Sequence, residues 1–439
     1  MTGRFHFLKP NNSDQLGAVL LLNCALGSKS ISNRLLSFAL LSKTAVQPEN
    51  ILVSEDTSIM RCAPHFNLKR GAQRFQVQVG RVKEFYVGNS GTTVRFLCPS
   101  FCFAFGSYLL YGSSRMHNRP IGSLITSLRV LGANVKWLAE NESLPLIINP
   151  PHTLRTFGVL KLEGESSSQF VTAMLLGSEL YGPRLGHNRC PPSISVRGTV
   201  SRSYISLTLQ LLERFGVVIE RDGWVKYFLQ TKPSDVLAEC MRLKVETDLS
   251  SASYFLIFGL VGSGSLVVPN IPIYSLQGDS LLVGVTSWLG LSILPSHSDL
   301  LILGKRQRPF PMKLGCGMIP DAAMSLLTLS AFVRAHPNHF TQLLTWRFKE
   351  TDRMLAMAIE LRKFQLVVEC SLDYLKVQQS QRPQNSDLAV GVKTYKDHRI
   401  AMSCSVLCFL NRRLRIWNPG CVNKTFPDFF HIFNNLTIG

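Results

Sequence analysis

Apolar residues recur along the chain with the 3.6-residue period of a helix, and several such stretches run through a glycine into a short strand-like segment. These glycines are Gly132, Gly216 and Gly290, 84 and 74 residues apart, and Gln365 takes the glycine position 75 residues later. A glycine after a helix supplies the left-handed conformation that turns the chain back. The spacing predicts a repeated unit and an α/β or α+β architecture of stacked repeats. The paired segments are 124–134 with 135–138, 207–215 with 217–219, 281–289 with 291–294, and 354–364.

The length of 439 residues and the hydrophobic content of 46% predict two or three domains with sizeable cores. Lys and Arg total 47 against 28 Asp and Glu, which gives a formal net charge of +19 and favours an anionic partner. The basic residues form no concentrated arm or tail, and no nucleic-acid motif accompanies them. We therefore expect no nucleic-acid partner.

Eleven cysteines, an odd number without a CxxC pair, argue against a disulfide framework and a structural zinc site. Cys98 and Cys102, like Cys404 and Cys408, are one helical turn apart, which predicts buried reduced thiols and a cytoplasmic protein. The uncharged stretches 96–114 and 249–278 are as long as a membrane span, but glycine and proline interrupt them. Because the N-terminus also lacks the layout of a signal peptide, we expect no membrane association.

Three segments place small, hydroxyl or amide side chains directly before an apolar helix. They are GSKSISNR at 27–34, GNSGTTVR at 88–95 and GESSSQ at 164–169. Backbone N–H groups at a helix N-terminus favour anions, and Lys29 and Arg34 add charge-assisted hydrogen bonds. The first segment lacks the spacing of a Walker A loop, so nucleotide binding is unsupported. Each opening alone is consistent with an ordinary capped helix, but three together predict binding of one polyanionic ligand set.

The segment RFKETDR at 347–353 interleaves three cations with two carboxylates just before another helix. Three other compact charged motifs, PDAA at 320–323, YKDHR at 395–399 and KTFPD at 424–428, are also bordered by apolar sequence. Solvated charge runs usually lie on amphipathic faces, which these motifs do not form. They are candidates for a catalytic or binding site.

In this order the motifs resemble those of the EPSP synthase (3-phosphoshikimate 1-carboxyvinyltransferase) family. The resemblance spans nearly the whole chain and rests on GSKSISNR, GNSGTTVR, NRPIG, SSSQF, SSASYFL, IPDAAM, KETDR, DHRIAM and KTFPDFF. The related UDP-N-acetylglucosamine enolpyruvyltransferase has a reactive-cysteine loop with no obvious counterpart in this sequence. The resemblance implies an α/β (α+β) fold of two domains, each with three helix-and-sheet repeats, and a cleft between them. It places a first domain, on the shikimate 3-phosphate side, at 28–243. The second, closing over phosphoenolpyruvate, combines 1–27 with 244–439.

The resemblance also implies a reaction and its residues. The enolpyruvyl group of phosphoenolpyruvate moves to the 5-hydroxyl of shikimate 3-phosphate, a step of aromatic amino-acid biosynthesis, with Glu350 as carbon-protonating acid, Asp321 as base and Lys29 stabilising the departing phosphate. The resemblance implies no metal or organic cofactor. It also implies a monomer. Shikimate 3-phosphate is assigned to Lys29, Ser30, Arg34, Ser167, Ser168, Gln169, Ser201, Asp321, Thr345 and Lys349. Phosphoenolpyruvate is assigned to Lys29, Asn89, Gly91, Arg119, Gln169, Arg353, Arg399 and Lys424.

Some positions depart from the family pattern. Phe96 stands where many members have proline, Gln365 replaces a turn glycine, and Thr345 stands where asparagine usually contacts the shikimate. None of these changes removes a charged catalytic group. A catalytically lapsed homologue that binds anions or partners is the alternative interpretation, and the retained Asp321 and Glu350 argue against it.

Overall fold

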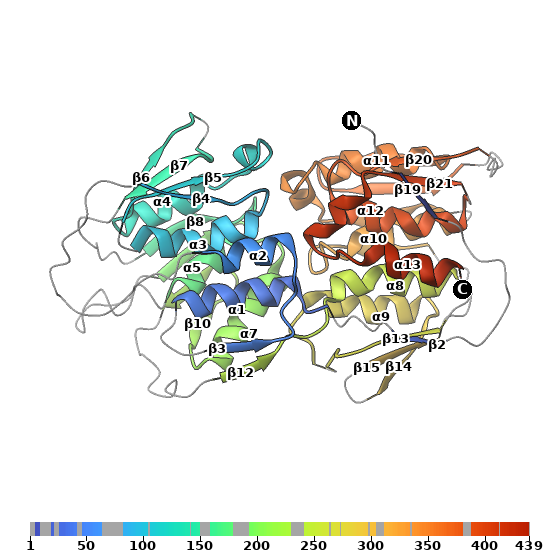
Figure 1. Ribbon diagram of the computed structural model, residues 1–439, viewed down its shortest axis with the longest axis horizontal. Coiled ribbons are helices and arrows are strands. Elements are labelled where there is room, and N and C mark those ends of the chain that lie inside the picture. The colour runs from blue at the N-terminus through green and yellow to red at the C-terminus, as the bar shows by residue number, and fades with distance from the viewer. Residues whose placement is uncertain are drawn as a thin grey trace. The chain divides into compact units, whose positions relative to one another are not determined.

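The chain forms two compact units by its internal contacts (Figure 1). Unit 1 comprises Met1–Lys29, Asn50–Glu55 and Val245–Gly439, and unit 2 comprises Ser30–Glu49 and Asp56–Lys244. The sequence pattern gave no signal that 50–55 groups with unit 1. This computed structural model describes residues 5–8, 19–21, 26–41, 46–63, 82–103, 106–140, 142–149, 159–178, 193–229, 241–262, 265–272, 274–296, 299–303, 311–333, 336–380, 388–411 and 413–438.

Unit 2 contains two four-stranded sheets, with strand orders β4-β5-β7-β6 and β10-β11-β9-β8, and a parallel pair of β3 with β12. The strands are β3 (Val46–Glu49), β4 (Lys83–Tyr86), β5 (Tyr108–Tyr111), β6 (Asn134–Trp137), β7 (Leu146–Asn149), β8 (Val159–Glu163), β9 (Ser193–Arg197), β10 (Ile219–Asp222), β11 (Lys226–Leu229) and β12 (Met241–Lys244). The helices are α1 (Lys29–Leu41), α2 (Glu55–Arg61), α3 (Gly91–Phe103), α4 (Gly122–Val130), α5 (Gln169–Leu176), α7 (Arg202–Arg214) and the 3-10 helix η1 (Met116–Asn118).

Unit 1 contains sheets with strand orders β1-β21-β20, β14-β15-β13-β2 and β16-β17-β19-β18. The strands are β1 (Phe5–Leu8), β2 (Val19–Leu21), β13 (Ser265–Val268), β14 (Ser292–Ser296), β15 (Asp299–Leu303), β16 (Lys313–Gly315), β17 (Asn338–Thr341), β18 (Leu366–Cys370), β19 (Leu375–Gln379), β20 (Gly391–Lys393) and β21 (Leu414–Trp417). The α-helices are α8 (Leu249–Val261), α9 (Leu281–Trp288), α10 (Ala323–Leu329), α11 (Arg353–Arg362), α12 (His398–Ser405) and α13 (Phe429–Ile438). The 3-10 helices are η2 (Gly278–Ser280), η3 (Ser330–Phe332), η4 (Leu344–Phe348), η5 (Val406–Phe409) and η6 (Pro419–Lys424).

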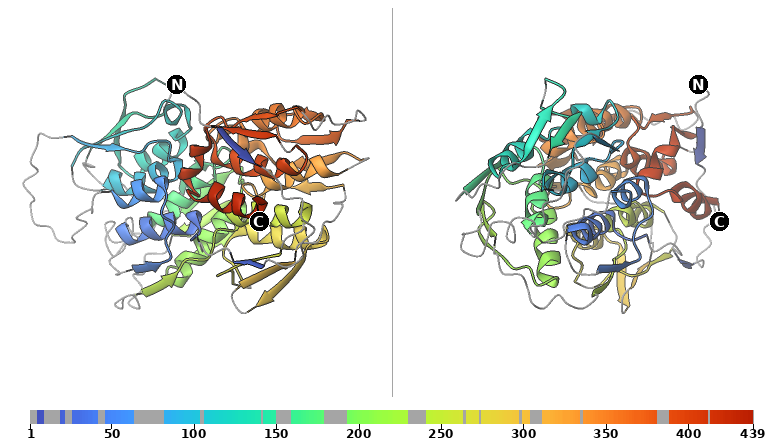
Figure 2. Two further views of the ribbon diagram at one scale, coloured as in Figure 1. Left: turned by 45° about the vertical axis from the view of Figure 1, so that its right-hand side comes forward. Right: turned by 60° about the vertical axis from the view of Figure 1, so that its left-hand side comes forward.

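The four-stranded sheets share one topology. In each, two strands pair in parallel, as β4 does with β5, and a hairpin such as β6-β7 completes the sheet in antiparallel register. A parallel pair needs a crossover, and a helix such as α3 between β4 and β5 provides it in three of these sheets, whereas unit 2 lies between β2 and β13 in the sequence. In unit 1, α10 packs against both α8 and α12, and the sheets lie outside these helices (Figure 2). The predicted fold class of helix-and-sheet repeats is confirmed.

The predicted turns after the helices are also confirmed. Gly132, Gly216 and Gly290 have φ angles of +102°, +73° and +101°. Gln365 adopts the same left-handed region, with φ of +59°, after α11. A residue with a Cβ atom is disfavoured in this region, whereas glycine is not.

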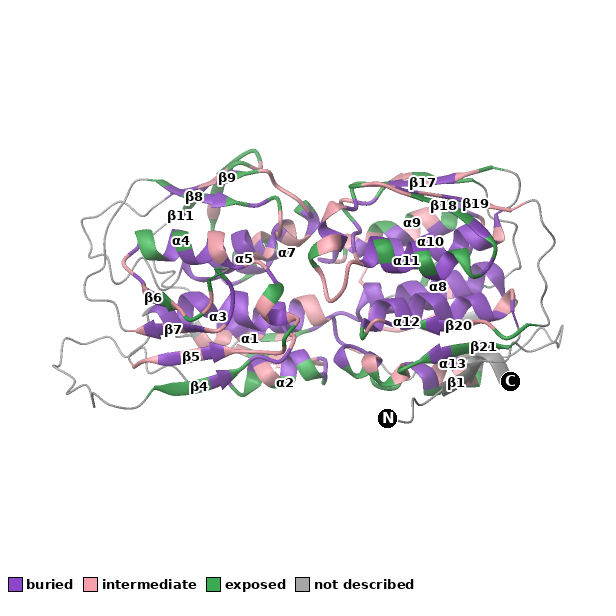
Figure 3. Ribbon diagram, turned by 90° about the horizontal axis from the view of Figure 1, so that it is seen from above, coloured by how far each residue is buried: buried purple, intermediate pink, exposed green. Residues whose placement is uncertain are grey.

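The two uncharged stretches that are as long as a membrane span, 96–114 and 249–278, contain helices with buried apolar side chains. Every residue of α8 is buried against other parts of unit 1, and the buried helices appear purple in Figure 3. Cys98 and Cys102 are buried in α3, and Cys404 and Cys408 are buried in unit 1, all as free thiols. In the described part of the chain, no helix is long and apolar enough to cross a membrane.

Gln365→Gly should stabilise unit 1 by about 1 kcal/mol, because it relieves the left-handed conformation of a residue with a Cβ atom. Urea unfolding of the variant and the wild type measures this change. Gln365→Ala is the matched control, since alanine keeps the Cβ atom, and it should give no gain. Equal stability of the glycine and alanine variants would contradict the strain argument.

Candidate active site

Arg34 lies in the second turn of α1, and its side chain is buried in unit 2. It donates from Nε to Thr208 Oγ1 (2.9 Å), from Nη1 to the Ser30 carbonyl (2.8 Å) and from Nη2 to the Tyr204 carbonyl (3.0 Å). The rings of Phe96 and Tyr204 lie 5.3 and 5.9 Å from its Cζ atom. Burial lowers the pKa of Arg34 to about 10, so the side chain remains charged at neutral pH. Phe96, one of the departures from the family pattern, therefore packs on a predicted ligand-binding arginine.

The loop that opens α3 supports Arg119. Arg119 Nη1 donates to the Asn89 carbonyl at 3.0 Å. A Cβ atom on Gly91 would lie 2.6 Å from Arg119 Nη2, so any side chain at this position would displace the guanidinium from where it lies. The structure thus brings together Asn89, Gly91 and Arg119, three residues predicted to bind phosphoenolpyruvate.

The helix α5 is tied to α3 through the side chain of Gln169. Gln169 Nε2 donates to Thr92 Oγ1 at 3.0 Å, and its Oε1 accepts from Arg95 Nη1 at 2.5 Å. Ser167 Oγ accepts from the Gln169 backbone N–H at 3.2 Å. Two of the predicted anion-binding openings therefore lie side by side in unit 2. Ser168 and Ser201 precede the first residues of α5 and α7.

The central feature of unit 1 is the buried guanidinium of Arg353, which three carboxylates share. It donates to Asp397 at 2.7 and 3.2 Å, to Asp321 at 3.1 Å and to Glu350 at 2.9 Å. Although burial alone would lower the pKa of Arg353, Asp397, Glu350 and Asp321 raise it above its ordinary value. Arg353 is therefore permanently charged and fixes the positions of the two predicted catalytic carboxylates.

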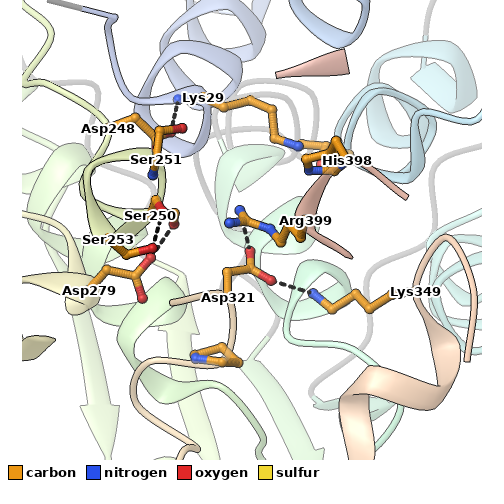
Figure 4. Close-up of polar contacts among 12 residues, drawn as sticks. Lys29, Asp248, Ser250, Ser251, Ser253, Asp279, Asp321, Lys349, His398 and Arg399 are labelled. Atoms are coloured by element: carbon orange, nitrogen blue, oxygen red, sulfur yellow. Dashed lines mark hydrogen bonds and ion pairs between the residues drawn. The ribbon is translucent and has the colours of Figure 1, made fainter. Parts of the chain in front are cut away.

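Further cations surround these two carboxylates. Arg399 Nη2 donates to Asp321 at 3.1 Å, and Lys349 Nζ lies 3.7 Å from the same side chain (Figure 4). Lys424 Nζ donates to Glu350 at 2.7 Å. Partial burial lowers the pKa of Lys349, and the charge of Asp321 partly offsets this. A compact cluster of alternating charges results.

A strained turn sets the start of α12. Tyr395 and Lys396 have φ angles of +53° and +59° directly before Asp397. The buried carboxylate of Glu360 holds this turn by accepting from Tyr395 Oη (2.8 Å) and the Lys393 backbone N–H (3.1 Å). Asp397 then accepts from the Arg399 backbone N–H at 2.9 Å and caps the helix. One side chain thus caps α12 and binds Arg353.

Lys29 is connected to the N-terminus of α8. Its backbone N–H donates to Asp248 Oδ2 at 2.9 Å, and Asp248 caps α8 by accepting from the Ser251 backbone N–H at 2.8 Å. A Cβ atom on Gly27 would lie 1.8 Å from the Asn50 carbonyl oxygen, so this close approach requires glycine. In Figure 4 the ammonium of Lys29 points towards His398. Burial, together with the charge of Lys29, lowers the pKa of His398 well below its ordinary value.

The hydroxyl of Thr345 is buried and has no hydrogen-bond partner in the described part of the chain. A buried hydroxyl without a partner is costly, which is consistent with the predicted contact to a polar ligand. Unit 2 therefore carries Ser30, Arg34, Asn89, Gly91, Arg119, Ser167, Ser168, Gln169 and Ser201, and unit 1 carries Lys29, Asp321, Thr345, Lys349, Glu350, Arg353, Arg399 and Lys424. Among the described residues, no group of His, Cys, Asp and Glu could hold a metal ion.

Comparison with known proteins decides the family. The model of EPSP synthase (3-phosphoshikimate 1-carboxyvinyltransferase) matches residues 23–433. The chain belongs to the EPSP synthase family. It is 37% identical over 432 residues to the 3-phosphoshikimate 1-carboxyvinyltransferase of Cupriavidus taiwanensis, covering 94% of this chain and 95% of that protein. It is 36% identical over 426 residues to the enzyme of the same name from Cellvibrio japonicus, covering 93% and 95%.

Solved structures share the fold of this family member. An EPSP synthase from Acinetobacter baumannii superposes with a TM-score of 0.71 at 19% identity, covering 99% of this chain and 98% of that one. The enolpyruvyl transferase NikO from Streptomyces tendae gives 0.69 at 13% identity, with the same coverage. At these identities the likeness concerns the fold, and it agrees with the predicted enolpyruvyltransferase architecture.

Sequence reasoning missed one buried carboxyl group of this family member. Asp279 lies in η2 and accepts a hydrogen bond from Ser250 Oγ, which belongs to the first turn of α8 (Figure 4). Burial raises the pKa of Asp279 to about 7, the charge of Asp321 adds to this effect, and Arg399 opposes it. Only its position within a polar QGDS segment could have drawn attention to it.

Asp279 should make the stability of this protein fall as the pH rises. The unfolded carboxyl ionises near pH 4, whereas the folded one keeps its proton until about pH 7, so its stabilising contribution is complete below pH 4 and lost above pH 7. Asp279→Asn removes this titration. The unfolding free energy of the variant minus that of the wild type should therefore rise by on the order of 2–4 kcal/mol as the pH is raised from 4 to 8.

Urea unfolding of both proteins at several pH values measures this difference, and Asp222→Asn, at an exposed position in β10, serves as the matched control. A difference between Asp279→Asn and wild type that stays constant across the pH range would contradict the raised pKa.

Proposed function

We propose that this chain transfers the enolpyruvyl group of phosphoenolpyruvate to the 5-hydroxyl of shikimate 3-phosphate, and that the residues assigned above carry this reaction. The single observation that supports it most is the cluster around Arg353. Two carboxylates, Asp321 and Glu350, share the guanidinium of Arg353 there. Each also contacts a cation of its own, Arg399 for Asp321 and Lys424 for Glu350, of the kind suited to phosphate and carboxylate groups. The products are 5-enolpyruvylshikimate 3-phosphate and inorganic phosphate.

Each unit contributes its own set of binding residues in this proposal. Unit 2 supplies helix N-termini, hydroxyl groups and Arg119, which bind anions mainly through fixed N–H donors. Unit 1 supplies Lys349, Arg353, Arg399 and Lys424, whose charges oppose the repulsion between two phosphates and two carboxylates. The substrates are small anionic molecules, and the excess of basic residues serves them.

Asp321 acts as the base. Arg353, Arg399 and Lys349 contact its carboxylate and favour the ionised form, so it is ready to accept the proton of the 5-hydroxyl. As that proton leaves, the hydroxyl oxygen forms a bond to the carbon that carries the phosphate in phosphoenolpyruvate. Because the same cations stabilise its ionised form, Asp321 is a weak base. It becomes a stronger base when anionic ligands also bind these cations.

Glu350 acts as the acid that protonates the methylene carbon. In the structure Arg353 and Lys424 favour its ionised form. An anionic ligand on the same two cations weakens that effect and raises the pKa of Glu350, so binding loads the acid with its proton. The tetrahedral intermediate then releases phosphate, which leaves with the proton that Asp321 took from the 5-hydroxyl, and the methyl group returns a proton to Glu350 to restore the double bond.

Phosphate release with both substrates tests this function, and a uridine-diphosphate sugar in place of shikimate 3-phosphate is the control. Glu350→Gln should lower turnover by roughly a hundredfold or more while shikimate 3-phosphate still binds, since general acid catalysis is commonly worth about that factor. Solvent deuterium should no longer enter the methylene position of recovered phosphoenolpyruvate. Asp321→Asn should slow turnover and also weaken shikimate 3-phosphate binding.

Calorimetry and isotope exchange on both variants distinguish the two roles. Wild-type exchange in Glu350→Gln, or unchanged shikimate 3-phosphate affinity in Asp321→Asn, would show that the residue has another role. Binding of both ligands to the wild type without phosphate release would instead identify a lapsed homologue.

A further inference from the structure

Arg95 is a buried cation of unit 2 that neither ligand set includes. It lies in the second turn of α3 and is 2% exposed. Its Nη2 donates to the Pro120 carbonyl at 2.7 Å, and its Nη1 donates to Gln169 Oε1 at 2.5 Å. A longer contact of 3.5 Å joins Nη1 to Ser167 Oγ. One guanidinium thus connects three ligand-binding segments: the opening of α3, the segment after Arg119 and the opening of α5.

The contact with Arg95 decides which way the amide of Gln169 faces. A guanidinium only donates hydrogen bonds, so the atom of Gln169 that meets it must be the carbonyl oxygen. The amide nitrogen is then turned to Thr92, to whose Oγ1 it donates one of its two N–H groups at 3.0 Å. The second N–H group is left for a ligand. With the opposite orientation, a carbonyl oxygen would face the anion and repel it.

Packing holds Arg95 in this position. The ring of Phe170, the residue after Gln169, lies 5.1 Å from the Arg95 Cζ atom. A planar guanidinium can stack on a ring and donate in two directions at once, whereas the ammonium group of lysine presents a single nitrogen. The site therefore depends on arginine and not on positive charge alone.

We propose that Arg95 is a positioning residue for substrate binding, which fixes the amide of Gln169 as a hydrogen-bond donor towards the anionic ligands and holds the three binding segments together. This rests on the proposed function, which gives Gln169 to both substrates. Arg95 itself touches neither ligand in this account. Its effect on affinity passes through Gln169.

A double-mutant cycle with Arg95→Met and Gln169→Met tests the proposal. Each single variant should weaken binding of shikimate 3-phosphate, measured by calorimetry, by roughly ten- to a hundredfold, the usual range for loss of a charge-assisted hydrogen bond. The double variant should be no worse than the weaker-binding single variant, because both changes remove the same oriented donor. In turnover assays the loss should lie in KM and not in kcat, since the proposed acid and base belong to unit 1.

Arg95→Lys separates orientation from charge and is also the replacement if Arg95→Met fails to fold. It keeps the charge but cannot reach Gln169 and Pro120 together, so its affinity should lie between those of the wild type and Arg95→Met. Arg129→Met is the matched control, because Arg129 also donates to a backbone carbonyl, that of Val135 at 2.6 Å, and stacks on a ring, that of Trp137. It should leave ligand affinity unchanged.

If the fold-loss of affinity in the double variant equalled the product of the two single losses, the proposal would be overturned, because Arg95 would then act on the ligands independently of Gln169. Wild-type affinity in Arg95→Lys would overturn it as well. Absence of phosphate release by the wild type would instead overturn the proposed function, and calorimetry would still decide the coupling. Failure of the wild type to bind either ligand would overturn both.

Discussion

The guanidinium of Arg353 imposes the constraint on which unit 1 is organised. A buried cation is tolerated only if carboxylates and hydrogen bonds compensate it, and Arg353 takes three carboxylates from three separate segments. Asp397 is one of them, and it also caps α12, so the position of Arg399 follows from the same pairing. The strained turn at Tyr395, held by Glu360, brings Asp397 into place. Local strain is thereby offset by a buried ion pair.

The charged cluster pairs both proposed catalytic carboxylates with cations, and these pairs bear on the proposed chemistry. Arg399 and Lys424 contact Asp321 and Glu350. Under the proposed function, an anionic substrate therefore shares these cations with the proposed base and acid. Sharing weakens the stabilisation of the ionised carboxylates and raises their pKa. The proposed function therefore couples substrate binding to protonation of Glu350. In unit 2, Arg34 and Arg95 instead donate hydrogen bonds to backbone carbonyls and side chains of the protein. Under the proposed function, these bonds position other groups that donate to the ligands.

The repeats could be predicted because a local signal repeats with them. Glycines at fixed places after helices mark left-handed turns. Gln365 adopts the same left-handed conformation although glycine is absent at this position. The family motifs identified the charged residues for the same reason, since each motif is contiguous. Asp279 lies outside these motifs, and Asp397 and Arg95 lie within two of them but received no role, because their roles depend on partners 29, 44 and 74 residues away. Periodicity and spacing do not reveal contacts of that range.

Proton uptake on ligand binding tests the central coupling most directly. Phosphoenolpyruvate without acceptor is titrated into wild type and Glu350→Gln near pH 7, in two buffers of different ionisation enthalpy, so that the heats report the protons bound. We predict that the wild type takes up more protons than the variant, by up to about one per site, because the anion shares Arg353 and Lys424 and raises the pKa of Glu350. The ligand's own ionisation cancels in the comparison. Equal proton uptake by two proteins that both bind phosphoenolpyruvate would contradict the coupling.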